Sequence, residues 1–142
     1  MRISELVQDL RAVENQYGNL VVRVDLGNET EQRAFPVGYT MAATFTYENN
    51  KVCIVVFISD HEKTRSDIFT CARLAEQLTA WQVLLGDVDV RIDLGFLASG
   101  LCHDIDNVLI GEFTSENLKA LVLYPATSRQ RINVIGRGLS VN

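Results

Sequence analysis

One stretch of the chain occurs twice. It reads Leu20-Val21-Val22-Arg23-Val24-Asp25-Leu26-Gly27 the first time and Val88-Asp89-Val90-Arg91-Ile92-Asp93-Leu94-Gly95 the second time. The offset of 68 residues holds well beyond this stretch. When residues 3–58 are laid over 71–126 without a gap, 14 of 56 positions are identical, where chance gives about 3 or 4. The sequence therefore predicts a tandem duplication.

The duplication predicts a single pseudo-symmetric domain over residues 1–142, because two copies are too few for an extended array. Repeat 1 spans about 3–58 and repeat 2 about 67–126. A polar linker at 59–66 joins them, and a basic tail follows at 127–142.

Each repeat begins with an amphipathic helix. Apolar residues recur at i, i+3 and i+4 over 4–17, with Ser4 as the expected N-cap and Gly18 as the stop. For the second helix we expect Ser66 or Asp67 to be the cap, and Gly86 ends it. Its apolar face is Cys71, Leu74, Ala75, Leu78, Trp81 and Leu85, which predicts that Trp81 packs in the core.

Three strands follow each helix, because period-2 alternation is typical of strands. We expect them near 20–26, 35–47 and 52–58, and again near 88–94, 105–115 and 119–124. The apolar face of the second strand is predicted to be Phe35, Val37, Tyr39, Met41, Ala43, Phe45 and Tyr47. A turn at 48–51 makes its connection a hairpin, since Asn tolerates a positive φ.

The fold class is therefore α+β: a duplicated helix–strand–strand–strand unit with two helices packed on antiparallel sheet. One continuous six-stranded sheet is the first expectation. Two three-stranded sheets packed together are the alternative.

Composition narrows the classes of function. The 142 residues carry a net charge of −5, and 47% are hydrophobic, as in an ordinary globular domain. The charge argues against nucleic acid as a partner. No apolar run approaches the length of a membrane span, and the N-terminus lacks the pattern of a signal peptide. Cys53, Cys71 and Cys102 are then expected to be free thiols in the cytoplasm.

The most interesting polar residues are two matching pairs. Arg23 and Asp25 in the first repeat, and Arg91 and Asp93 in the second, lie on the strand face away from the core. They are candidate partner-binding residues on an open sheet face. Ion pairs along or across the strands are the structural alternative.

The tail holds a second group of candidates. Arg129, Arg131 and Arg137 lie in a segment without acidic residues, which suits an acidic partner, although a solvated terminus is the alternative. A short strand at 132–135 is also conceivable there.

Catalytic and metal chemistry have weaker support. Cys102, His103 and Asp104 adjoin one another, but catalytic triads assemble from separated positions. Asp106 would complete a metal cluster that no ligand spacing supports. His61 is the only other histidine. The sequence predicts no metal and no cofactor.

The opening Met1-Arg2-Ile3-Ser4-Glu5-Leu6, followed by Tyr17-Gly18-Asn19-Leu20-Val21-Val22, resembles small bacteriophage and prophage proteins with an ISEL-type helix and a GNLxVxV-type strand. This resemblance implies a phage origin and a location in the host cytoplasm, and it implies no catalytic residue. The leading hypothesis is a non-enzymatic accessory protein that binds another protein, with a homodimer plausible because sheet edges invite pairing. The alternative is a small hydrolase or ligand-binding enzyme that uses the Cys102–Asp106 loop or the Arg/Asp face.

Overall fold

The computed structural model describes residues 1–25, 34–59, 68–94, 102–113 and 117–126. Most of the expected linker and the whole expected strand at 132–135 lie outside these residues. In the described part, neither helix is long and apolar enough to cross a membrane.

Within these described residues the structure is α+β, with two helices and six strands in mixed sheet. The first half contains α1 (Ile3–Tyr17), β1 (Val21–Asp25), β2 (Ala34–Phe45), the 3-10 turn η1 (Thr46–Glu48) and β3 (Lys51–Ile58). The second half contains α2 (Cys71–Leu85), β4 (Val90–Asp93), β5 (Cys102–Phe113) and β6 (Leu118–Pro125). The Cys102–Asp106 segment, expected to be a loop, is therefore the start of β5.

The strands close into a barrel in the order β1-β2-β3-β4-β5-β6. Four neighbouring pairs are antiparallel, but β1 pairs with β6 and β3 pairs with β4 in parallel. The prediction of a purely antiparallel sheet was wrong. Hairpins fix the direction of strands within a repeat, but the pairing between repeats is decided by the tertiary structure.

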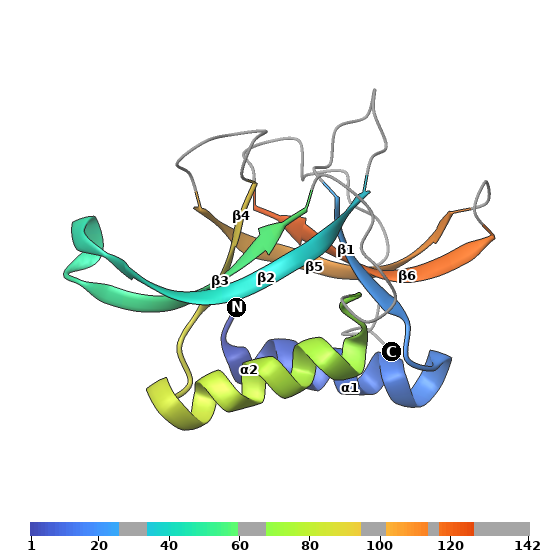
Figure 1. Ribbon diagram of the computed structural model, residues 1–142, viewed down its shortest axis with the longest axis horizontal. Helices are drawn as coiled ribbons and strands as arrows, with labels where there is room; N and C mark the ends of the chain where they lie inside the picture. The colour runs from blue at the N-terminus through green and yellow to red at the C-terminus, as the bar shows by residue number, and fades with distance from the viewer. Residues whose placement is uncertain (26–33, 60–67, 95–101, 114–116, 127–142) are drawn as a thin grey trace.

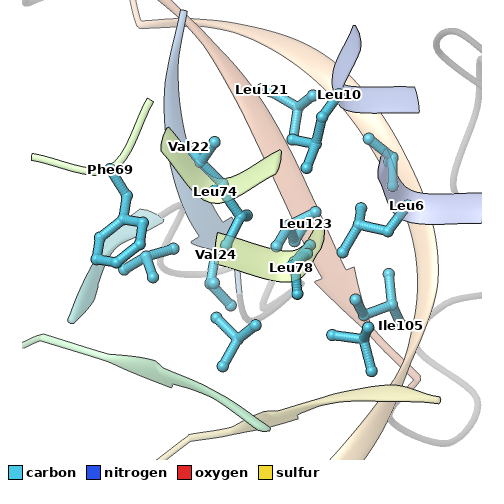
Figure 2. Packing of buried hydrophobic residues seen from close by; sticks show 14 of the residues in the cluster. Leu6, Leu10, Val22, Val24, Phe69, Leu74, Leu78, Ile105, Leu121 and Leu123 are labelled. Atoms are coloured by element: carbon cyan, nitrogen blue, oxygen red, sulfur yellow. The ribbon is translucent and has the colours of Figure 1, made fainter. Parts of the chain in front are cut away.

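The two helices lie side by side beneath the barrel, and the β2–β3 and β5–β6 hairpins project to either side (Figure 1). The helices bury their apolar faces against the strands, because an apolar helix face is stable when a sheet shields it from water. Figure 2 shows side chains from both helices among those of the strands: Leu6, Leu10, Leu74 and Leu78 with Val22, Val24, Ile105, Leu121 and Leu123. Trp81 packs partly buried against this core.

Corresponding contacts recur in the two halves. Arg23 is paired with Pro36, and 68 residues later Arg91 is paired with Asp104. The N–H of Cys71 donates to the Leu20 carbonyl at 2.8 Å, and the N–H of Ile3 donates to the Val88 carbonyl at 2.9 Å. Two further pairs of backbone hydrogen bonds correspond in the same way. The N–H of Val22 donates to the Phe69 carbonyl, and the N–H of Val90 donates to the Met1 carbonyl. The N–H of Gly18 donates to the Glu14 carbonyl, and the N–H of Gly86 donates to the Gln82 carbonyl. That this arrangement arose by tandem duplication stays a prediction.

The gapless offset does not continue through the second hairpin. Phe45 is paired with Lys51, whereas Phe113 is paired with Leu118, so this hairpin is one residue shorter. Positions in β6 therefore correspond to β3 with an offset of 67, which places Ile54 and Leu121 alike in the core. The sequence match of Lys51 with Lys119 is not a structural match.

A β-bulge overturns the predicted faces of β2. The register shifts between Val37 and Tyr39, as it does between Ile105 and Asn107 in β5. Because a bulge inserts one extra residue, it reverses which side chains face inward. Beyond the bulge Thr40 is buried, while Tyr39 and Met41 are half exposed.

The bulge residue of β2 is Gly38, and the backbone of β3 comes close to it. A Cβ atom at Gly38 would lie 3.2 Å from the Phe57 carbonyl oxygen. The two strands can approach this closely because glycine has no side chain.

The helix ends also differ from expectation. Arg2, not Ser4, is the N-cap of α1, and Thr70, not Ser66 or Asp67, is the N-cap of α2. The Thr70 hydroxyl accepts from the N–H of Arg73 at 3.3 Å. Gly18 and Gly86 end the helices with positive φ values of 96° and 86°, as predicted.

Candidate functional site

The two Arg/Asp pairs do not form one site. Arg23 and Asp25 lie on β1, and Arg91 and Asp93 lie on β4. In the barrel order, two strands separate β1 from β4 in either direction, so the pairs lie on opposite sides. The sequence identified a repeated feature but not this separation, which depends on barrel closure.

Arg91 is held by residues of β2, of the turn η1 and of the neighbouring strand β5. It donates two hydrogen bonds to the Glu48 carboxylate at 2.5 and 2.6 Å, and its Nε lies 3.4 Å from an Asp104 oxygen. The guanidinium also lies 4.5 Å from the centre of the Phe45 ring. Only 11% of its side chain is exposed. Arg91 thus anchors the β2–β3 hairpin against β4 and β5.

The charges around Arg91 shift the pKa values of the ionisable groups beside it. The hydrogen bonds from Arg91 hold the pKa of Glu48 below its usual value, and Glu48 raises the pKa of Arg91. Nearby, Lys51 Nζ lies 2.5 Å from Asp89 Oδ2 and lowers the pKa of that carboxyl. All of these groups are charged at neutral pH, as expected for structural ion pairs.

Arg23 occupies a corresponding position on the other side. Its guanidinium lies 5.1 Å from the centre of the Phe113 ring, the counterpart of Phe45. Arg23, Asp25 and Asp93 all make further interactions with the protein. The remaining candidates, Arg129, Arg131 and Arg137, lie outside the described residues.

The residues considered for catalysis are not brought together. Cys102 and His103 are successive residues of β5, so their side chains point to opposite faces of the strand. His103 Nδ1 lies 3.3 Å from the Ala126 carbonyl oxygen. Burial, followed by the nearby Asp93, raises the pKa of the Cys102 thiol, the opposite of what a nucleophile requires.

Two other features of the molecule bear on ligand binding. Among the described residues, no group of three His, Cys, Asp or Glu side chains is arranged to hold a metal ion. A shallow hollow of about 130 Å³ lies at the end of the β5–β6 hairpin, lined by Glu112, Phe113, Asn117, Leu118 and Lys119. It is too small for a drug-sized ligand, which needs about 300 Å³ or more.

The sequence analysis missed an exposed apolar surface at the C-terminal end of α2. Val83 is 82% exposed and Leu84 is 74% exposed, and the exposed Ala80 lies on the same side of the helix. We call Ala80, Val83 and Leu84 the α2 stripe. Its i, i+3, i+4 spacing is visible in the sequence on the face opposite the predicted core face, so the signal was available.

The corresponding end of α1 is polar. The positions that match Val83 and Leu84 are Asn15 and Gln16, and both are exposed. The same backbone environment therefore carries amides in one half and large aliphatic side chains in the other. The environment tolerates polar residues, so folding alone does not require Val83 and Leu84.

A second difference concerns the projecting hairpins. We call the part of β2 from Tyr39 to Phe45 the β2 edge, and the matching part of β5 from Asn107 to Phe113 the β5 edge. The β2 edge contains no charged residue, and Tyr39 and Met41 are each 50% exposed. The β5 edge carries Glu112 at the position that matches Thr44.

A hydrogen-bond chain connects α2 to β2. Trp81 Nε1 donates to the Thr40 hydroxyl at 3.0 Å, and this hydroxyl donates to Gln77 Oε1 at 2.9 Å. The helix that carries the α2 stripe is thereby fixed to the strand that carries the β2 edge.

Comparisons with protein-family models, with curated proteins and with solved structures found no match to this chain.

Proposed function

We propose that this protein is a non-enzymatic binding protein and that the α2 stripe inserts into an apolar groove of another protein. The observation that carries the proposal is the contrast between Val83 and Leu84 and their polar counterparts Asn15 and Gln16. Exposing large aliphatic side chains to water costs free energy that burial in a partner would recover, and such patches commonly mark protein contacts.

The spacing of the stripe suits one mode of recognition. Helices that dock into grooves use apolar anchors at i, i+3 and i+4, which is the spacing of Ala80, Val83 and Leu84. The Trp81–Thr40 bond holds this end of α2 against the barrel, so little conformational entropy is lost when the stripe binds.

The Arg/Asp pairs are weaker candidates for the same role. Arg91 is largely covered and already bound to Glu48, so a partner that engaged it would have to displace this ion pair. The predicted phage or prophage origin is part of the proposal, and so is a role as an accessory protein in the host cytoplasm.

The test is an affinity capture from host-cell lysate with three forms of the full chain. V83N/L84Q copies the residues of α1 into α2, and N15S/Q16S alters the matching end of α1 as a control. We expect a partner that is captured by the intact chain and by the control, and lost with V83N/L84Q. Thermal unfolding of all three forms checks that they fold equally well.

A photo-crosslinking residue then maps the contact. Placed at position 83 it should crosslink the captured partner, and placed at position 15 it should not. Capture that persists undiminished in V83N/L84Q, crosslinking only from position 15, or the absence of any captured protein would overturn the proposal.

A further inference from the structure

The β2 edge is a strand edge that no described strand pairs with on its β1 side. β1 pairs with β2 only at Ala34, Phe35 and Pro36, and β3 pairs with the opposite edge of β2 from Val37 onward. Over Tyr39–Phe45, none of the described strands lies beside β2 on the β1 side. An open edge presents unpaired N–H and C=O groups, which are a template for another strand.

The residues of this edge lack the usual protection against pairing. Proteins commonly place charges or proline on open edges to prevent association. Residues 37–47 contain neither, and the sequence there is Val-Gly-Tyr-Thr-Met-Ala-Ala-Thr-Phe-Thr-Tyr. The matching edge of β5 does carry charges, Asp106 just before it and Glu112 within it. Of these two matching edges in the described part of the chain, the β2 edge is therefore open to pairing and the β5 edge is protected.

From this contrast we infer that two copies of the protein form a twofold dimer in which their β2 edges pair antiparallel. The two β2–β3 hairpins would then become one four-stranded sheet. This inference concerns a surface other than the α2 stripe and does not rest on the proposed function.

A second copy fits the edge for reasons of charge. The chain has a net charge of −5, so two copies repel each other wherever acidic surfaces meet. Between two β2 edges every twofold register places only uncharged side chains opposite one another, which avoids the penalty for like charges in cross-strand pairs. The half-exposed Tyr39 and Met41 would gain apolar neighbours across the new pairing.

The protection of β5 explains why assembly would stop at two. A contact that joins different surfaces of identical copies leads to rings or open fibres, whereas a twofold contact of one surface with itself is closed. Of the two matching edges that the structure describes, the β5 edge carries Glu112, and the β2 edge carries no charge. Two such edges satisfy each other and leave none free.

The test uses substitutions that exchange the edges. Thr44→Glu introduces into β2 the residue that β5 carries at the matching position, where the second hairpin accommodates it. Glu112→Thr is the matched control in β5. We expect analytical ultracentrifugation to show a dimer for the full chain and for E112T. For T44E we expect at least a tenfold higher dimer dissociation constant, because each copy then brings a carboxylate into a pairing of two acidic chains.

Amide hydrogen exchange gives a second readout that does not depend on the variant. Residues 39–45 should be protected in the intact dimer and lose protection in T44E, while residues 107–113 stay unchanged. A monomeric intact chain would overturn the inference, and protection of the edge in that monomer would identify a segment of the same chain as the occupant. A dimer that T44E leaves intact, or one that only V83N/L84Q disrupts, would place the contact elsewhere and equally overturn it.

Discussion

Asp87, the second residue after α2, caps the first turn of α1. Its Oδ1 accepts from the backbone N–H of Ser4 at 2.8 Å, and its Oδ2 accepts from the Ser4 hydroxyl at 2.6 Å. The counterpart in the other half is Asn19, whose Oδ1 accepts from the N–H of Ala72 at 2.8 Å. In each helix a first-turn N–H is thus bonded by the second residue after the other helix, which ties the two halves together.

This reciprocal capping predicts a loss of stability when either cap is removed. Asn19→Ala should lower the free energy of unfolding by about 0.5–2 kcal/mol, the usual cost of losing a cap. Asp87→Ala should also destabilise, and its effect should depend on pH. Hydrogen bonds from Ser4 lower the pKa of Asp87, so its contribution is complete above about 3.8 and lost as the pH falls through its folded pKa. Urea unfolding at pH 7 and pH 3 measures both effects, and an equal effect of Asp87→Ala at both pH values would contradict the prediction.

The position of Asp9 predicts a stabilising substitution. Burial, followed by the like charge of Glu5 one turn earlier, raises the pKa of Asp9. An acid whose folded pKa is raised stabilises only below its unfolded pKa, so ionised Asp9 opposes folding at pH 7. Asp9→Gln copies Gln77, the residue at the matching position of α2, and should raise the melting temperature at pH 7. The gain should disappear near pH 3, and Gln8→Ala on the exposed side of α1 serves as the control.

The Trp81–Thr40–Gln77 chain predicts strong coupling between β2 and α2. Thr40→Val copies Val108 from the matching position of β5, but it leaves the Trp81 N–H without its acceptor. We expect a loss of about 1–3 kcal/mol in the free energy of unfolding, the cost of a buried group left unsatisfied. In the double variant with Trp81→Phe the further effect of Thr40→Val should be much smaller. Additive effects in this double-mutant cycle would show that the bond contributes little.

We expect that replacement of Arg91 by lysine destabilises the protein. Lysine cannot make the two parallel bonds to Glu48 and stack on Phe45 at the same time. Arg91→Lys should therefore lower the melting temperature, and Arg91→Ala should lower it further because the side chain that covers Phe45 is lost. Glu48→Gln separates the ionic contribution from packing. A melting temperature of Arg91→Lys equal to that of the intact protein would contradict this role of the bidentate pair.

The thiols provide a test of the enzymatic alternative. Burial raises the pKa of Cys71 to about 11 and also raises the pKa values of Cys53 and Cys102. Since the thiolate is the reactive form, iodoacetamide at pH 8 should label all three more slowly than it labels a free cysteine peptide. Unfolding in guanidinium should remove the difference. Rapid labelling of Cys102 alone in the folded protein would instead favour the enzyme hypothesis.

The sequence by itself determined the local structure. Helical periodicity placed both helices to within about a turn, and the strands were identified because alternation of apolar residues has a period that helices lack. The asparagines at 49 and 50 have the positive φ values that the predicted turn requires. These features depend on neighbours in the chain, and for that reason one sequence was sufficient to predict them.

Only the tertiary structure decided how the pieces meet. The parallel pairing of β1 with β6 and of β3 with β4 depends on barrel closure, which no local pattern encodes. The bulge at Gly38 reversed the predicted faces of β2, because one inserted residue changes the side of every later residue. The caps from Asp87 and Asn19 come from the opposite half of the chain. Finally, the contrast between Val83, Leu84 and the uncharged β2 edge and their counterparts in the other half gained its meaning from the tertiary structure. Exposure and strand pairing are properties of the folded chain.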